Sequence, residues 1–194
     1  MKKIIFILLV ALSQSFATQA QTQFEVEGVT VPRTINFEGS KLELNGFGVR
    51  SKAWVDVYVQ ALYLTILSQD PEFIMDSETP MGIRIEIISS LVSSKKLSKA
   101  LYSGLEKSVG DEGMLKIEKE AKMLETIVNS EITKKGDVFH LIYNPTDVSI
   151  WIMKNDKLAG KIAGLDFKKA FLGIWLSNNP VDKDLKNDLL GIIK

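Results

Sequence analysis

The 194-residue sequence contains no cysteine and one histidine, His140. The lack of cysteine excludes disulfide frameworks, thiolate metal sites, iron–sulfur clusters and cysteine nucleophiles. One histidine leaves little for metal binding, so we expect no metal and no cofactor. The formal net charge is zero, with 24 basic and 24 acidic residues. Proteins that bind nucleic acid present a basic face, so we expect no nucleic-acid partner.

Proline is scarce as well, with five residues, and the aromatic fraction is 8%. Neither collagen-like nor low-complexity segments fit this composition, and no stretch repeats at a fixed period. The hydrophobic fraction of 45% is typical of a globular protein. We therefore expect one domain, which occupies residues 21–194.

The N-terminal segment predicts a secretory signal peptide. Lys2 and Lys3 precede an apolar run over residues 4–12, and small and polar residues fill 13–20. The run is too short to cross a membrane as a helix, which takes about 20 residues. A buried N-terminal helix or strand is the alternative interpretation. We expect a signal peptide over residues 1–20, cleavage before Gln21, no stable membrane span afterwards, and a periplasmic or secreted protein.

The first third of the mature chain has the alternating pattern of β-strands. Apolar and polar residues alternate over residues 24–27, 41–45 and 54–60. In the last of these, the face with Val55, Val57 and Val59 is expected to be core. A kink or bulge is expected at residues 46–48. A turn at Ser51–Lys52 would close a hairpin and pair Tyr58 with Asn45.

Later segments alternate between strand and helix patterns. Residues 83–87, 137–143, 148–153 and 158–162 read as strands, and a Pro71 to Pro80 loop precedes the first of them. Apolar residues then recur every three or four positions after Ser93 and again after Asp111, which predicts two amphipathic helices. Two more helices are predicted over 166–176 and 182–192. Strands and helices in this order predict an α+β fold.

Few residues have the pattern of a functional site, and none forms a specific catalytic motif. His140 permits a Ser-His-Asp triad on paper, but no Gly-x-Ser-x-Gly sequence accompanies it; a structural or surface role is the expected one. Arg50 is one of three arginines and follows a glycine-rich strand, where its guanidinium suits a carboxylate. Tyr58 could add a hydroxyl donor. The alternative is that the face with Tyr58 simply meets solvent.

Two segments resemble the chalcone isomerase-like family. They are the hairpin Leu44-Asn45-Gly46-Phe47-Gly48-Val49-Arg50-Ser51-Lys52 with the strand after it, and the C-terminal run that contains Ala170-Phe171-Leu172-Gly173-Ile174-Trp175-Leu176 and Asn179-Pro180-Val181-Asp182. The resemblance implies an open-faced β-sandwich, in which a large antiparallel sheet packs against a layer of helices with a ligand cleft between them. It also implies that Arg50 and Tyr58 match the arginine and tyrosine that hold a fatty-acid carboxylate in non-catalytic members.

The resemblance fails at two catalytic positions. The enzymes of the family carry a tyrosine and an asparagine on one helix, where this sequence has Leu97 and Gly104, and Tyr102 lies about 140° around the helix from Leu97. We therefore expect no catalytic residue, and an exported binding protein for a small amphipathic ligand such as a fatty acid. The alternatives are an intramolecular lyase of chalcone isomerase type, or an envelope interaction protein with a vestigial cleft.

Overall fold

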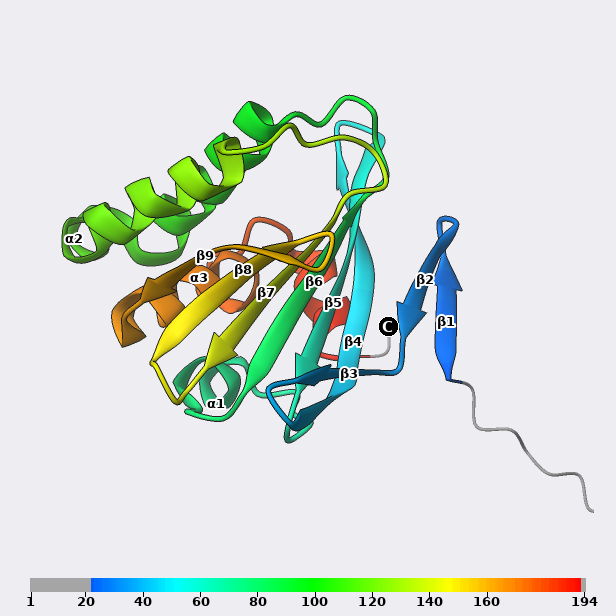
Figure 1. Ribbon diagram of the computed structural model, residues 1–194, viewed down its shortest axis with the longest axis horizontal. Coiled ribbons are helices and arrows are strands. Elements are labelled where there is room, and N and C mark those ends of the chain that lie inside the picture. Colours follow the sequence, from blue (N-terminus) through cyan, green and yellow to red (C-terminus); the bar gives the residue numbers. More distant parts are fainter. Residues whose placement is uncertain (1–21, 193–194) are drawn as a thin grey trace, which may run out of the picture.

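A seven-stranded antiparallel sheet forms the centre of the molecule in the computed structural model, which describes residues 22–192 (Figure 1). Each strand pairs with the next along the chain, in the order β3-β4-β5-β6-β7-β8-β9. The strand bounds are β3 Thr34–Phe37, β4 Ser40–Lys52, β5 Val55–Leu64, β6 Met81–Ile87, β7 Val138–Asn144, β8 Ser149–Lys154 and β9 Lys157–Ala163. A separate hairpin consists of β1 Gln23–Val26 and β2 Val29–Pro32.

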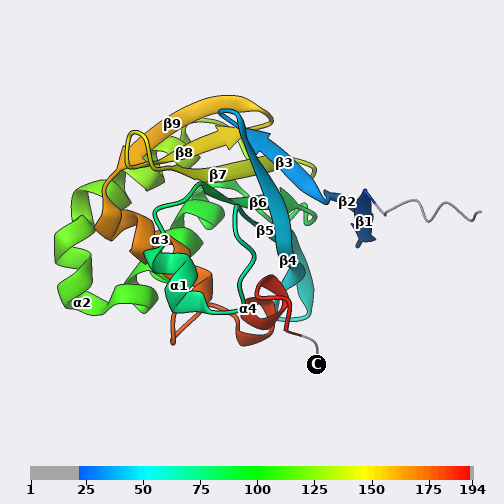
Figure 2. The same cartoon turned by 90° about the horizontal axis from the view of Figure 1, so that it is seen from below.

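The helices lie together on one side of the sheet (Figures 1 and 2). Their bounds are α1 Pro71–Asp76, α2 Ser94–Asn129, α3 Leu165–Leu176 and α4 Lys183–Leu189. Within α2, Gly110 has φ 66° and ψ −177°, which breaks the helix into two segments. The two segments lie side by side, and Asn129 Nδ2 donates to Ser98 Oγ at 2.9 Å between their far ends. The two amphipathic helices predicted after Ser93 and Asp111 are thereby confirmed.

Each face of the sheet has its own apolar core. The larger core joins the helix-facing side chains of the sheet to α1, α2, α3 and α4, and Trp175 and Phe171 of α3 are fully buried in it. The smaller core lies on the other face, where Val29 and Val31 of β2 pack with Val59 of β5. The predicted α+β class and open-faced β-sandwich are confirmed, with the short β1–β2 hairpin covering part of the open face.

Some local predictions were wrong. The Pro71–Pro80 segment contains a helix, α1, where only a loop was predicted; Asp70 caps it and Pro71 starts it. The helix predicted over 182–192 ends at Leu189. On β5, Val59 is buried as predicted, but Val55 is exposed and the face with Tyr58 is the one that the helices cover. The predicted signal peptide lies outside the described residues.

Candidate functional site

Arg50 and Tyr58 are direct cross-strand neighbours on β4 and β5. The predicted turn at Ser51–Lys52, which would have paired Tyr58 with Asn45, is wrong. The hairpin turns at Ala53 and Trp54 instead, which have φ 48° and 64°. An irregularity between Arg50 and Ser51 then shifts the register so that Arg50 faces Tyr58. The bulge predicted near Gly46 is present, between Leu44 and Gly46.

Tyr58 points into the helix-facing core, so the alternative of a solvent-facing tyrosine is excluded. Only 9% of the residue is exposed, and its hydroxyl accepts a hydrogen bond of 3.1 Å from Nε1 of Trp175 on α3. Burial raises the pKa of the Tyr58 hydroxyl above its usual value, against smaller lowering effects of Trp175 and Arg50. The hydroxyl therefore stays protonated at neutral pH and keeps its hydrogen as a donor.

Arg50 already holds a carboxylate. Its Nη1 lies 2.9 Å from Oδ2 of Asp182, and the two side chains are 21% and 19% exposed. The same Nη1 also donates to the Ser51 carbonyl. The other oxygen of Asp182, Oδ1, accepts from the backbone N–H groups of Asp184 and Leu185 and so caps α4. The ion pair thereby links the N-terminus of α4 to Arg50 of β4.

Gln60 lies two residues beyond Tyr58 on the same face of β5 and is fully buried. Neither Nε2 nor Oε1 of its amide has a hydrogen-bond partner. A buried amide without partners costs free energy, about 1–3 kcal/mol for each unsatisfied group. Such a group in a native core therefore requires an explanation, and a bound polar molecule is one.

The glycine-rich segment of β4 accommodates α4. A Cβ at Gly46 would lie 2.2 Å from the carbonyl oxygen of Asp188, and one at Gly48 would lie 2.6 Å from Oδ2 of the same residue. A glycine-rich strand is also where a ligand could approach the backbone closely. In the structure, the C-terminal part of α4 fills that space.

Leu97 and Gly104, which stand where the resemblance implies a tyrosine and an asparagine in the enzymes, are closely packed and apolar. Leu97 is 5% exposed within the main core. A Cβ at Gly104 would lie 2.7 Å from Cγ2 of Ile174 and 3.3 Å from Cγ1 of Val181, so the close contact between α2 and α3 leaves no room for a larger side chain. Tyr102 packs against the same core. The positions therefore carry no proton-handling group.

His140 lies within strand β7 of the sheet, and its environment is not that of a catalytic triad. It pairs with Arg84 across β6 and β7, and its Nδ1 lies 3.7 Å from Oδ1 of Asp156. Burial and the charge of Arg84 lower the pKa of His140, so the imidazole is neutral at pH 7. Within residues 22–192, no three histidine or acidic side chains gather as metal ligands.

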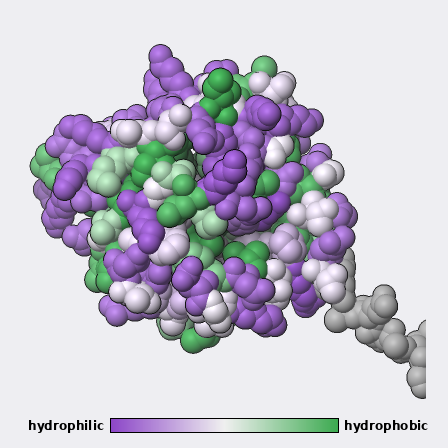
Figure 3. All heavy atoms as spheres, viewed as in Figure 1, coloured by the Kyte–Doolittle hydropathy of each residue, from purple (hydrophilic) through white to green (hydrophobic). Residues whose placement is uncertain are grey.

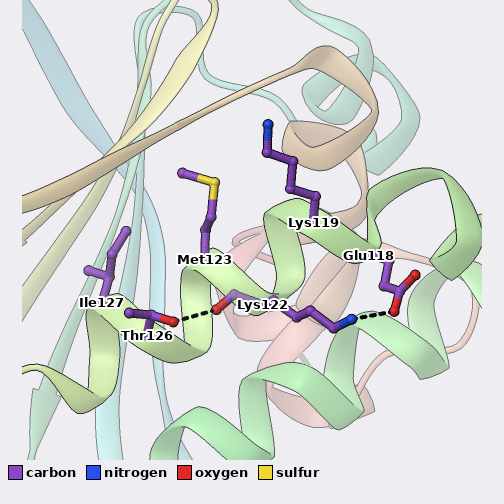
Figure 4. Close-up of a pocket in the computed structure, with 6 residues that line it drawn as sticks. All are labelled: Glu118, Lys119, Lys122, Met123, Thr126 and Ile127. Carbon is purple, nitrogen blue, oxygen red and sulfur yellow. Dashed lines mark hydrogen bonds and ion pairs between the residues drawn. The ribbon is translucent and has the colours of Figure 1, made fainter.

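Two surface hollows lie away from the Arg50–Tyr58 pair. One, of about 570 Å³, runs along the second segment of α2 and is lined by Glu118, Lys119, Lys122, Met123, Thr126 and Ile127 (Figure 4). One of its two lysines, Lys122, pairs with Glu118 at 2.5 Å. The other, of about 250 Å³, lies between β1, β4 and the end of α4.

Among the described helices, none is long and apolar enough to cross a membrane.

The sequence indicated Arg50 and Tyr58 as candidate site residues, but it did not single out Gln60, Trp175 or Asp182. A glutamine inside the apolar run of β5 is a signal that was available. Asp182 after Pro180 was also recognisable as a helix cap. Its contact with Arg50 was not, because the two residues are 132 positions apart.

Comparison with known proteins agrees with the fold. A family model described as chalcone isomerase-like matches residues 23–191. Among solved structures, the fatty-acid binding protein AtFAP1 of Arabidopsis thaliana superposes with a TM-score of 0.69 and 16% sequence identity, over 87% of this chain and 95% of that one. A search of curated protein sequences finds no match.

Proposed function

Because the chain belongs to the chalcone isomerase-like family, we propose that it is a non-catalytic protein that binds a fatty acid, with Arg50 and Tyr58 holding the carboxylate. The observation that carries the proposal is the cross-strand pairing of these two residues at the sheet–helix interface. It brings a guanidinium and a protonated phenol together, and both are donors suited to a carboxylate.

The ion pair with Asp182 supports this assignment of Arg50. The Asp182 carboxylate lies 2.9 Å from Nη1, so the guanidinium can donate to a carboxylate in its present position. The pair is about one-fifth exposed, so an incoming acid can reach Arg50 from the surface. The carboxylate of the ligand would take the place of the Asp182 side chain and add a hydrogen bond from Tyr58.

The surroundings of the pair suit an acyl tail. Leu62 and Ile85, near Gln60, belong to the main apolar core, as does Leu101 of α2. Burial of a tail there contributes about 0.8 kcal/mol for each methylene. Side chains fill this interface in the structure, so binding includes a movement of α4 away from β4. Fixing the carboxylate then orients the ligand, while the tail supplies most of the affinity.

The test is calorimetric titration of the delipidated protein with dodecanoic acid. Loss of a charge-assisted hydrogen bond costs about 1.5–3 kcal/mol, so Arg50→Ala is expected to weaken binding roughly ten- to a hundred-fold. Arg50→Lys is expected to lose less affinity than Arg50→Ala, because lysine keeps the positive charge but cannot donate two parallel hydrogen bonds to a carboxylate. Tyr58→Phe costs less, about one neutral hydrogen bond.

Lys41→Ala serves as the matched control, since Lys41 is a cation on the same strand that is exposed and pairs with Glu43. Its affinity is expected to equal that of the wild type. Equal affinity of the wild type and a folded Arg50→Ala variant would overturn the assignment of Arg50. A native mass spectrum that detects a co-purified acyl ligand would support the proposal independently.

We also propose that the protein is exported, by cleavage before Gln21. Lys2 and Lys3, the apolar run and the small residues that follow occur in the order that the secretory machinery reads. N-terminal sequencing of the exported protein is expected to start at Gln21. An intact Met1 on protein that stays in the cytoplasm would contradict it.

A further inference from the structure

Three connections of the chain meet at one end of the sheet. They are the end of the β4–β5 hairpin (residues 51–56), the β6–α2 connection with the first turn of α2 (88–96), and the α2–β7 connection (130–137). All three lie at the upper end of the molecule in Figure 1. We call this surface the three-loop end.

Hydrogen bonds hold the three connections together. They join the second connection to β5 and the third connection to β6 and to α2: Ile88 N to Val57 O at 3.1 Å, Gly136 N to Ile87 O at 2.8 Å, and Thr133 N to Ser94 Oγ at 2.8 Å. The three-loop end is therefore one surface with a defined arrangement.

Each connection exposes at least one large apolar side chain, and the hairpin end exposes Val55, at 37%, as well as Trp54. Trp54 is 101% exposed, Ile132 is 85% exposed and Leu91 is 62% exposed. At this end, Figure 3 shows hydrophobic surface among hydrophilic surface. Single exposed apolar residues are ordinary. Exposed apolar side chains on each of three joined loops are less so, and they suggest a binding surface.

Trp54 has no role in the fold that would explain its position. It sits at φ 64° after Ala53 at φ 48°, in a two-residue turn that favours asparagine and glycine. A bulky residue rarely adopts this conformation, and its complete exposure means that no packing compensates. Strained residues of this kind occur at functional sites.

Lysines surround these three side chains. The three-loop end has five exposed lysines and two exposed acidic residues: Lys52, Lys95, Lys96, Lys134 and Lys135, with Asp56 and Glu131. Glu131 lies 3.7 Å from the ammonium group of Lys154. The adjacent β8–β9 turn adds one charge of each sign, Asp156 and Lys157. The surface is thus basic on a protein whose overall charge is balanced.

We infer that the three-loop end docks onto an anionic lipid bilayer, with Trp54, Leu91 and Ile132 entering the interface and the lysines facing lipid phosphates. Tryptophan is enriched at membrane–water interfaces. A lysine near an anionic surface contributes about 1 kcal/mol. Interfaces between proteins are depleted in lysine, whereas five lysines are exposed on this surface.

This docking places the proposed ligand site near the membrane. Arg50 is on the same hairpin as Trp54, four residues earlier. A bilayer at the three-loop end would therefore lie next to the ion pair of Arg50 and Asp182, where an acid would enter. The docking surface itself is formed by other residues, so membrane binding and fatty-acid binding can succeed or fail separately.

The test is sedimentation with vesicles of the chain that begins at Gln21, which contains every described strand and helix and both cores. It also lacks the apolar N-terminal run, which would itself bind lipid. We expect binding to vesicles of phosphatidylglycerol and phosphatidylcholine, at least tenfold weaker binding to phosphatidylcholine alone, and weakening by salt. Lipids with brominated acyl chains are expected to quench tryptophan fluorescence through Trp54.

Variants locate the contact. Trp54→Gly suits the positive φ and keeps the turn, Leu91→Ser removes a second apolar side chain, and Lys134→Glu reverses one charge. Each is expected to weaken vesicle binding about tenfold. Trp54→Gly should also abolish the quenching. The matched controls are Leu115→Ser, at a side chain that is 78% exposed on α2, and Lys116→Glu beside it.

Several outcomes would overturn the inference. They are no binding to anionic vesicles, equal binding to neutral ones, and equal losses in the control variants. Capture of a protein by this surface that Trp54→Gly abolishes, without vesicle binding, would assign it to a protein partner instead. Dodecanoic acid titration of the same variants without vesicles is expected to match the wild type, so that failure here is distinguishable from failure of the proposed function.

Discussion

Arg50 of β4 and Asp182 at the N-terminus of α4 form an ion pair with 2.9 Å between Nη1 and Oδ2. Asp182 also caps α4 with its other oxygen. One carboxylate therefore both caps the helix and forms the ion pair with the guanidinium of Arg50. Under the proposed function, a fatty-acid carboxylate would therefore compete with Asp182 for the same guanidinium. Such competition would link ligand binding to the position of α4.

Asp182→Asn is expected to increase the affinity for dodecanoic acid about tenfold. Asparagine is as good a helix cap as aspartate, but the neutral amide gives up a charge-assisted bond to Arg50, about 1.5 kcal/mol or more. Calorimetry measures the change. Asp70→Asn is the control, since Asp70 caps α1 in the same way. An unchanged or lower affinity in a folded Asp182→Asn variant would contradict the competition.

Gln60→Leu is expected to stabilise the protein. The substitution replaces a buried amide without partners by an apolar side chain of similar size, which should raise the free energy of unfolding by about 1–2 kcal/mol. Urea denaturation measures that change. If Gln60→Leu and Gln60→Met both destabilise the protein, Gln60 has a structural role.

Chalcone isomerase activity is expected to be absent. Positioned polar and proton-transfer groups each contribute about one to a few powers of ten in rate, and Leu97 and Gly104 lack them. A spectrophotometric assay with a hydroxylated chalcone measures the rate of isomerisation. Gly104→Asn should not create activity, because its Cβ would meet Ile174 at 2.7 Å and cost about 1–3 kcal/mol of stability. Turnover by the wild type that Arg50→Ala abolishes would refute the prediction.

Lys168 is expected to make the protein more stable as the pH rises above about 8. Its ammonium group donates to the carbonyls of Met75 and Ser77 at 2.6 Å each, and burial lowers its pKa from 10.5 to about 8. Between these two pKa values the unfolded chain keeps a proton that the folded protein has lost. The free energy of unfolding therefore increases with pH in this window, by at most about 1.4 kcal/mol per pH unit.

Chemical denaturation at several pH values between 7.5 and 9.5 measures the contribution of Lys168. Lys168→Met has no proton to release, so the rise in unfolding free energy with pH is expected to be smaller than in the wild type. Lys41→Met is the control, because Lys41 is an exposed lysine that pairs with Glu43 and has no part in the environment of Lys168. Parallel pH profiles of the wild type and Lys168→Met would show that the group does not titrate in this window.

Much of the fold was predictable because it follows local periodicity. Alternation at Phe24–Glu27 and Ile83–Ile87 indicated strands, and the spacing of Leu97, Leu101 and Leu105 indicated a helix whose apolar face is buried. The hairpin turn was not predictable in this way. Ala53 and Trp54 lack the residue types that usually mark a turn with positive φ, so a turn at Ser51–Lys52 was the better prediction from local chemistry.

The sequence by itself determined the α+β class, the separate helical segments around Gly110 and the identity of Arg50 and Tyr58 as candidate donors, because these depend on neighbours along the chain. Only the tertiary structure decided that Arg50 faces Tyr58, that Asp182 occupies the arginine and that Gln60 is buried without a partner. Those relationships depend on strand register and on helices more than a hundred residues away. Residues that far apart meet only through the packing of the whole chain, which no local pattern encodes.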